Sequence, residues 1–121
     1  MSFRFKKELL EALCDACRQV YPNEFLALLG VKKDKGLVEE FVAVPAEFGR
    51  NFSSYRLDLL PIDSSIVGSI HSHPSASANP SIQDLKVFAR GKVNLIIAFP
   101  FDLKTIKAFD NHGKELEIVM E

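Results

Sequence analysis

Residues 66–84 read IVGSIHSHPSASANPSIQD and carry most of the information about how this chain folds. The small and apolar residues from Ile66 to His73 predict a buried strand, and the Ser, Ala, Asn and Pro residues of 74–80 predict a loop. Ser81 can cap the start of a helix that we expect over residues 81–89. A strand, a loop and a helix in this order indicate a domain of mixed α/β type.

The segment before this stretch predicts one helix and one hairpin. Leucine and cysteine residues recur every three or four positions in residues 5–20, which predicts an amphipathic helix that ends before Pro22. Phe25–Val31 is an apolar run that ends in a charged turn, and Leu37–Val44 follows this turn as a second strand candidate, so we expect a β-hairpin. Residues 45–54 look irregular, and residues 55–60 could form a short strand or a helical turn.

The segment after it predicts a further buried strand and a second hairpin. Val93–Phe99 is continuously apolar, as expected for a strand that is covered on both faces. Thr105–Phe109 and Leu116–Met120 lie on either side of Asp110-Asn111-His112-Gly113, which has the chemistry of a hairpin turn. These elements together predict an α/β sandwich built around one mixed sheet.

Composition limits the number of domains and the kinds of partner. A chain of 121 residues with 47% hydrophobic residues has the size and make-up of one globular domain, so we expect a single domain over residues 1–121. Fifteen basic and sixteen acidic residues leave a net charge of -1, so we expect neither nucleic acid nor a membrane as partner. Residues 1–10 show no signal peptide, which favours a cytoplasmic location. The oligomeric state stays open.

Two histidines and one aspartate have the spacing of a metal site. His71 and His73 are two positions apart on the predicted strand, so both imidazoles point to the same face. Asp84 lies eleven residues after His73, in the first turn of the predicted helix, and the loop can bring its carboxylate to the imidazoles. Two His and one carboxylate would leave a tetrahedral zinc ion with an open fourth position for a water.

Each of these residues also has a purely structural explanation. Ser81 and Asp84 could simply begin a helix, and the imidazoles could be core or rim side chains. Cys14 and Cys17 form a C-x-x-C in mid-helix, which favours core packing over redox chemistry. A structural zinc site made of these cysteines and the two histidines is conceivable, but it would leave Ser81 and Asp84 unexplained. His112 fits an exposed turn.

The segment from His71 to Asp84 resembles the signature of the JAMM (MPN+) zinc metalloprotease family, which includes deubiquitinating isopeptidases. The family pattern is His-Ser/Thr-His-Pro, a loop and Ser-x-x-Asp, and His71-Ser72-His73-Pro74 and Ser81-Ile82-Gln83-Asp84 match it without a gap. The order of the other predicted elements is similar to the family over nearly the whole chain. The resemblance implies a minimal, prokaryotic-type member, with a curved mixed sheet flanked by helices as in cytidine deaminases.

The resemblance also implies a role for each residue of the site. His71, His73 and Asp84 would bind one zinc ion, with a water as its fourth ligand. Glu24 stands where the family has Glu-x-x-Gly-x-Leu, although Ala27 replaces the glycine, and it would shuttle a proton between the water and the leaving amine. Partial burial at the start of a strand would suit Glu24 to that task, but the sequence alone does not distinguish it from other glutamates. Ser81 would stabilise the oxyanion.

The implied substrate is a ubiquitin-like or sulfur-carrier-like protein with an extended C-terminal tail that ends in Gly-Gly. The enzyme would hydrolyse a peptide or isopeptide bond at this tail. Two other functions fit the same fold. One is a non-catalytic scaffold or interaction domain, and the other is a domain of the RadC type, which is linked with DNA repair. A zinc deaminase would need cysteine ligands after a proline, and none follows.

Overall fold

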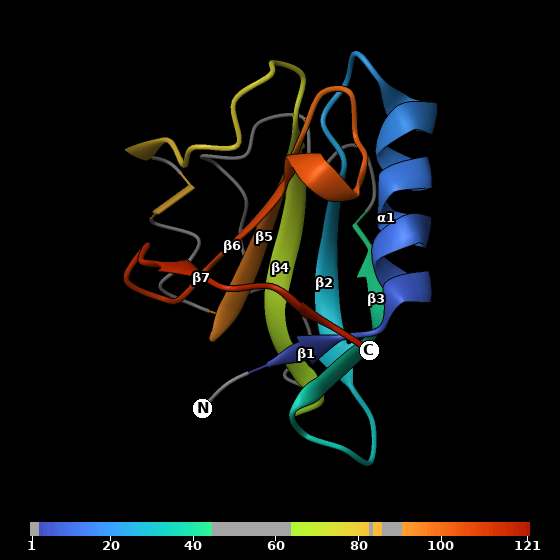
Figure 1. The fold of residues 1–121 in the computed structure, drawn as a ribbon, viewed down its shortest axis with the longest axis vertical. Coiled ribbons are helices and arrows are strands. Elements are labelled where there is room, and N and C mark those ends of the chain that lie inside the picture. The colour runs from blue at the N-terminus through green and yellow to red at the C-terminus, as the bar shows by residue number, and fades with distance from the viewer. Residues whose placement is uncertain (1–2, 45–63, 83, 86–90) are drawn as a thin grey trace.

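Eight strands, one α-helix and one 3-10 helix are described over their full length in the structure. The structure is a computed structural model of the chain and describes residues 3–44, 64–82, 84–85 and 91–121. In chain order the elements are β1 (Arg4–Phe5), α1 (Lys7–Val20), β2 (Leu26–Val31), β3 (Leu37–Ala43), β4 (Ile66–His73), β5 (Val93–Ala98), η3 (Leu103–Thr105), β6 (Ile106–Phe109), β7 (Glu115–Leu116) and β8 (Val119–Met120) (Figure 1).

The strands make one mixed sheet that curls until its two edges approach each other. Its order is β7-β6-β5-β4-β2-β3-β1-β8. Strand β4 runs parallel to β5, and β1 runs parallel to β3 and β8, whereas the other pairs are antiparallel. A flat sheet of this order would hold its edges about 34 Å apart. Residues 117 and 118 alone join β7 to β8, and three Cα steps span at most about 11 Å, so the sheet has to curl (Figure 1).

Helix α1 packs against one face of this sheet and completes the main core. Its apolar stripe, predicted from the spacing of three and four, is buried; the buried residues are Leu9, Leu10, Leu13, Cys14 and Cys17. The helix begins at Lys7 and not at residue 5, because Arg4 and Phe5 form β1 and pair with Leu37 and Val38 of β3. A two-residue strand leaves no periodic signal, so the predicted helix was too long at its start.

Side chains alternate between the two faces of the sheet, and each face contributes to a different hydrophobic cluster. Ile70 of β4 belongs to the main core beneath α1, together with Leu95 and Ile97 of β5. The neighbouring residues Ile96 and Ala98 point the other way and form a smaller cluster with Ala78 and Phe109. Strand β5 is therefore buried along its whole length, as its sequence predicted. His71 and His73 lie on the face opposite α1.

The first predicted hairpin is confirmed, and the second is confirmed only in part. Strands β2 and β3 pair antiparallel, and the turn between them is closed by a hydrogen bond from Gly36 N to Asp34 Oδ1. At the second turn, Asp110 Oδ1 accepts hydrogen bonds from the backbone N–H groups of His112 and Lys114, and the strands β6 and β7 pair on either side.

The prediction of one strand over Leu116–Met120 is wrong, because the chain changes partner within this segment. Only Glu115–Leu116 pairs with β6, whereas Val119–Met120 crosses to the other edge of the sheet and pairs with β1. Glu121 N donates to Phe5 O, and Lys7 N donates to Glu121 O. Pairing with β1 therefore satisfies backbone groups at that edge. Thr105 belongs to η3 and not to the strand that follows it.

Some predictions fall on residues outside the described part of the chain. These are the irregular segment 45–54, the ambiguous segment 55–60 and most of the predicted helix 81–89. Of this helix, Ile82, Asp84 and Leu85 are described, and all three are helical. Within the described residues, none of the helices combines the length and the hydropathy that crossing a bilayer requires.

Candidate metal centre

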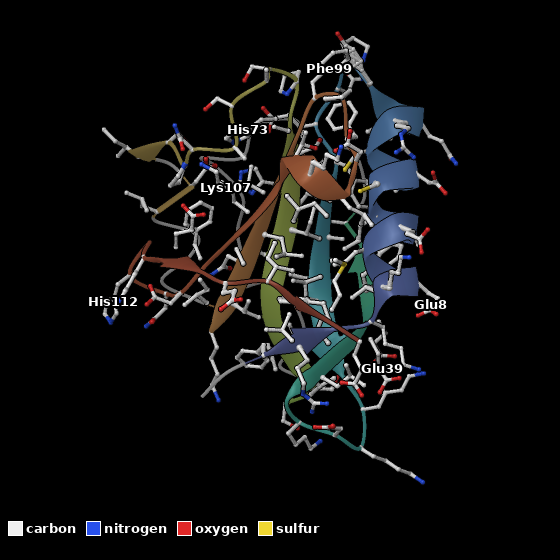
Figure 2. All side chains as sticks on the ribbon, in the orientation of Figure 1. Glu8, Glu39, His73, Phe99, Lys107 and His112 are labelled. Carbon is white, nitrogen blue, oxygen red and sulfur yellow. The ribbon has the colours of Figure 1, made fainter. Side chains whose placement is uncertain are left out.

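The C-terminal end of β4 brings the two histidines together on the face of the sheet opposite α1. The Nε2 atoms of His71 and His73 lie 3.1 Å apart. His71 is 1% exposed and His73 lies nearer the surface (Figure 2). Strand β4 is held on both sides, by β2 and by β5, so the two rings are mounted on a rigid part of the sheet.

Asp84 completes the cluster, and a helix cap aims its carboxylate. Asp84 Oδ1 lies 2.9 Å from His71 Nε2, and Oδ2 lies 3.1 Å from His73 Nε2. Ser81 N donates to Asp84 Oδ2 at 2.7 Å, and Asp84 N donates to Ser81 Oγ at 3.2 Å. This reciprocal pair is a capping box. The structural explanation of Ser81 and Asp84 is therefore correct, and the cap itself turns the carboxylate toward the imidazoles.

Contacts on the far side of His73 decide which of its nitrogens faces the cluster. His73 Nδ1 lies 3.0 Å from the carbonyl oxygen of Ser77. A carbonyl only accepts hydrogen bonds, so Nδ1 carries the proton and the neutral ring has a lone pair at Nε2. That lone pair points at the carboxylate of Asp84 and at His71. An arrangement of this kind is typical of histidines that bind a metal through one nitrogen and a carbonyl through the other.

Electrostatics at the cluster favour a positive charge between these side chains. When the ring is protonated, His73 Nε2–H donates to the Asp84 carboxylate, which raises the pKa of His73 although burial of the ring works against it, and the nearby charge of Glu24 raises that pKa further. Burial alone would raise the pKa of Asp84, but hydrogen bonds from His71, His73 and the Ser81 N–H outweigh it and hold that pKa well below its usual range. The anionic carboxylate can be neutralised by a proton on an imidazole or by a metal cation.

The donor set fits a zinc ion. In a tetrahedral site with bonds of about 2.0–2.1 Å, neighbouring ligand atoms lie about 3.3 Å apart. In this cluster the two Nε2 atoms lie 3.1 Å apart, Asp84 Oδ1 lies 2.9 Å from one of them and Oδ2 3.1 Å from the other, and one ligand atom from each residue falls within 4.8 Å of the others. Within the described ranges, no fourth His, Cys, Asp or Glu joins the group. Three protein ligands with a further position open are the mark of a catalytic site and not of a structural one.

The prediction that Glu24 is partly buried is wrong, whereas its role in the site stays a prediction. Glu24 is exposed and precedes β2, which begins at Leu26. Leu26 pairs with His71 on the antiparallel neighbour β4, and Phe25 is hydrogen-bonded to Ser72. Counting on by one residue brings Glu24 level with His73. The glutamate lies just before the strand and not inside it, so the sheet does not cover it.

Other candidate residues lie away from this cluster. Cys14 and Cys17 are buried in the core on the α1 side, where burial raises the pKa of their thiols to about 11 and about 12 respectively. They are core cysteines, as predicted, and do not share a metal site with the histidines. His112 lies exposed in its turn, also as predicted.

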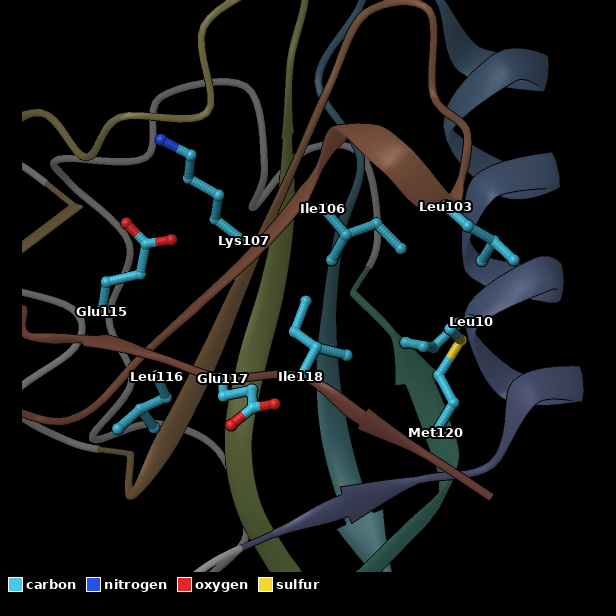
Figure 3. Close-up of a pocket in the computed structure, with 9 residues that line it drawn as sticks. All are labelled: Leu10, Leu103, Ile106, Lys107, Glu115, Leu116, Glu117, Ile118 and Met120. Carbon is cyan, nitrogen blue, oxygen red and sulfur yellow. The ribbon is translucent and has the colours of Figure 1, made fainter.

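A pocket of about 340 Å³ opens between α1, β6 and the C-terminal segment (Figure 3). It is lined by Leu10, Leu103, Ile106, Lys107, Glu115, Leu116, Glu117, Ile118 and Met120. None of the predicted zinc ligands borders it, so this pocket is separate from the candidate metal centre.

Two contacts of the site were not found from the sequence. The Ser77 carbonyl that orients His73 is a backbone group in a loop, and no residue pattern indicates it. Ser72 hydrogen-bonds to Phe25, the neighbour of Glu24. A signal for Ser72 did exist, because a residue between two histidines that share one face has to point to the opposite face.

Comparisons of the sequence with known proteins agree on one family. A sequence model of the prokaryotic homologues of the JAB domain matches residues 6–111. A protein of Haloferax volcanii described as a probable metalloprotease is 34% identical in an alignment 116 residues long, and the match covers 88% of this chain and 72% of that relative. These matches support a metalloprotease.

Solved structures agree with this result. A crystal structure of a JAB1/MPN domain protein from Archaeoglobus fulgidus is 32% identical, with a TM-score of 0.79 over 98% of both chains. A second structure, described as JAMM, a metalloprotease-like zinc site in the proteasome and signalosome, is 28% identical, with a TM-score of 0.78 over 100% of this chain and 99% of the other. Its curled mixed sheet, its cluster of two histidines and an aspartate, and these matches place the chain in the JAMM metalloprotease family, among the prokaryotic JAB-domain homologues.

Proposed function

We propose that this protein is a zinc-dependent peptidase or isopeptidase that cleaves at the C-terminal tail of a small ubiquitin-like or sulfur-carrier-like protein. The observation that carries the proposal is the convergence of His71 Nε2, His73 Nε2 and the Asp84 carboxylate. One zinc ion bound by these groups would act as a Lewis acid on the scissile carbonyl and make a nearby water more acidic. We expect the reaction to take place in the cytoplasm.

Glu24 is proposed as the general base and then the general acid. Its exposed carboxylate, level with His73, can accept a proton from the attacking water as the new C–O bond forms. It can return this proton to the nitrogen as the C–N bond breaks, which releases an amine and a carboxylate. Exposure lets the same carboxylate exchange protons with solvent between turnovers.

Ser81 is proposed to stabilise the oxyanion of the tetrahedral intermediate. Its Oγ accepts a hydrogen bond from Asp84 N, which uses a lone pair and leaves the hydroxyl proton available. Ser81 is exposed beside Asp84, so the same hydroxyl can cap the helix and donate to a substrate oxygen. Removing a donor of this kind costs about 3 kcal/mol of transition-state stabilisation in enzymes where it has been tested.

The proposed substrate follows from the family resemblance. Members of this family act on proteins whose extended tails end in Gly-Gly, and an extended tail can pair with a strand edge by main-chain hydrogen bonds. The chain of 121 residues leaves little room for the insertions that give some members selectivity for particular ubiquitin linkages. A small modifier or sulfur carrier therefore fits better than a ubiquitin chain.

The proposal is tested by cleavage of fusions in which a ubiquitin-like protein is joined through Gly-Gly to a reporter. We expect cleavage after Gly-Gly that stops when a chelator removes the metal and returns when zinc is added. Glu24→Gln should keep its zinc and lose turnover, whereas Glu11→Gln, on the exposed side of α1, should behave as wild type. A zinc-loaded protein that cleaves none of the fusions would overturn the proposal and favour a scaffold.

A further inference from the structure

We propose that Ser72 is a positioning residue that holds the general base Glu24 opposite the metal ligands, by clamping the backbone of Phe25. The inference rests on the proposed role of Glu24. Ser72 lies between His71 and His73 in sequence but points to the opposite face of the sheet, toward α1, and it is 1% exposed. It therefore does not belong to the donor set, although it is a direct neighbour of two of its members.

Two hydrogen bonds join Ser72 to Phe25. Ser72 N donates to the Phe25 carbonyl oxygen at 3.0 Å, and Phe25 N donates to Ser72 Oγ at 2.7 Å. In a regular antiparallel pair the second bond would go to the backbone carbonyl of the facing residue. Here the side chain takes the place of that carbonyl, at the point where β2 begins. The entry to β2 is therefore fixed by a hydroxyl group and not by the sheet ladder alone.

A third group orients this hydroxyl. The Ser72 hydroxyl also lies close enough to the thiol of Cys17, which is 0% exposed on α1, to lower the pKa of that thiol against the larger effect of burial. The hydroxyl accepts the bond from Phe25 N and has one proton left to donate toward this thiol. Cys17 in the core, Ser72 on β4 and Phe25 at the entry to β2 form a continuous chain of contacts that ends one residue from Glu24. Cys17 therefore contributes indirectly to the position of Glu24, because it contacts the hydroxyl that holds Phe25.

The clamp matters because Glu24 is exposed and precedes the first residue of β2. Without the Ser72 hydroxyl, Phe25 N loses its partner and the segment before β2 is held by one bond fewer. The imidazoles stay in place, because β4 remains paired with both β2 and β5. A displacement of about 1 Å at a reacting group can reduce turnover about 100-fold. Loss of the Ser72 hydroxyl should therefore slow proton transfer by Glu24 and leave metal binding unchanged.

The test compares Ser72→Ala with Ser72→Thr and with Ser69→Ala. Ser69 is a matched control, because it is another buried serine of β4 and bonds to Asn94, away from Phe25. We expect Ser72→Ala to keep one zinc per chain and wild-type KM while kcat falls about 10- to 100-fold. Ser72→Thr keeps the hydroxyl and should retain the wild-type kcat, and Ser69→Ala should also leave kcat unchanged. Hydrogen exchange at the Phe25 amide should be faster in Ser72→Ala alone.

A double variant separates positioning from a general structural effect. In a Glu24→Gln background, Ser72→Ala should cause no further loss of kcat, because the group that it positions is already absent. Loss of zinc from Ser72→Ala, an equal loss of kcat in Ser69→Ala, or unchanged exchange at the Phe25 amide would each overturn the inference.

The amide measurement also keeps the inference distinct from the proposed function. If Glu24→Gln stays active, the role of Glu24 fails, while exchange at the Phe25 amide still reports on the clamp. If Ser72→Ala does not fold, Ser72→Cys replaces it, since the thiol has the same shape and is a weaker acceptor, and the same outcomes apply.

Discussion

Substitution of Asp84 separates its role in the helix cap from its role as a metal ligand. Asp84→Ala removes the acceptor for Ser81 N, and a lost cap costs about 1 kcal/mol. For a chain of 121 residues the entropy of unfolding is about 0.25 kcal/mol/K, so the metal-free variant should melt about 4 °C below the metal-free wild type. Asp84→Asn keeps an oxygen that can accept from Ser81 N, so this part of the loss should be absent.

Zinc should then stabilise the wild type and not the variants. With free zinc about 1000-fold above its Kd, binding adds about 4 kcal/mol, or about 16 °C. Asp84→Ala and Asp84→Asn both lack the anionic ligand, so we expect neither to show this shift or to retain zinc. The assay is thermal unfolding with chelator and with zinc, together with metal content by plasma mass spectrometry. If Asp84→Ala retains one zinc per chain and gains the full shift, the reasoning is refuted.

Two further predictions concern the strand that carries the histidines and the pH dependence of the site. A Cβ on Gly68 would lie 1.5 Å from the Val93 carbonyl oxygen, so Gly68→Ala should lose more than about 3 kcal/mol of unfolding free energy in a denaturant titration. A Cβ on Gly30 meets Cγ of the Glu40 side chain at 3.0 Å, which can shift by a few tenths of an ångström as a backbone carbonyl cannot, so Gly30→Ala should stay within about 1 kcal/mol, and equal losses would contradict this account. The pKa of His73 is raised by its hydrogen bond with Asp84, so in the metal-free protein this contribution to stability is present at low pH and is lost as the pH rises through that pKa. Zinc binding has the opposite sign because it needs the neutral ring, so chelator competition from about pH 8 to about pH 5.5 should show affinity falling with pH, and a constant affinity would exclude His73 as a ligand.

The predictions that succeeded depend on short-range patterns. The period of two along β4 indicates that His71 and His73 share a face, whatever the rest of the chain does. The apolar run of β5 and the turn around Asp110 are equally local. The capping signal at Ser81 also needs only four residues. Each of these features arises from bond geometry and the nearest neighbours, so a single sequence is enough to reveal it.

The features that escaped prediction depend on contacts between distant parts of the chain. Strand β1 exists because Phe5 is buried against β3, and β8 exists because the C-terminal segment satisfies the free edge of β1. The exposure of Glu24 depends on where β2 begins, since only the sheet decides which residues it covers. No local pattern contains this information.

The metal centre itself combines both kinds of information. The residue types and their spacing in 71–84 identify the donors, because only imidazole and carboxylate groups at these positions could meet at one ion. Their arrangement at distances of 2.9–3.1 Å requires the rigid support of β2 and β5 around β4 and the cap that turns Asp84 inward. The contact of Ser72 with Phe25 joins residues 47 positions apart. Such a contact forms only when hydrophobic burial has brought α1, β2 and β4 together, and it is therefore a property of the folded chain.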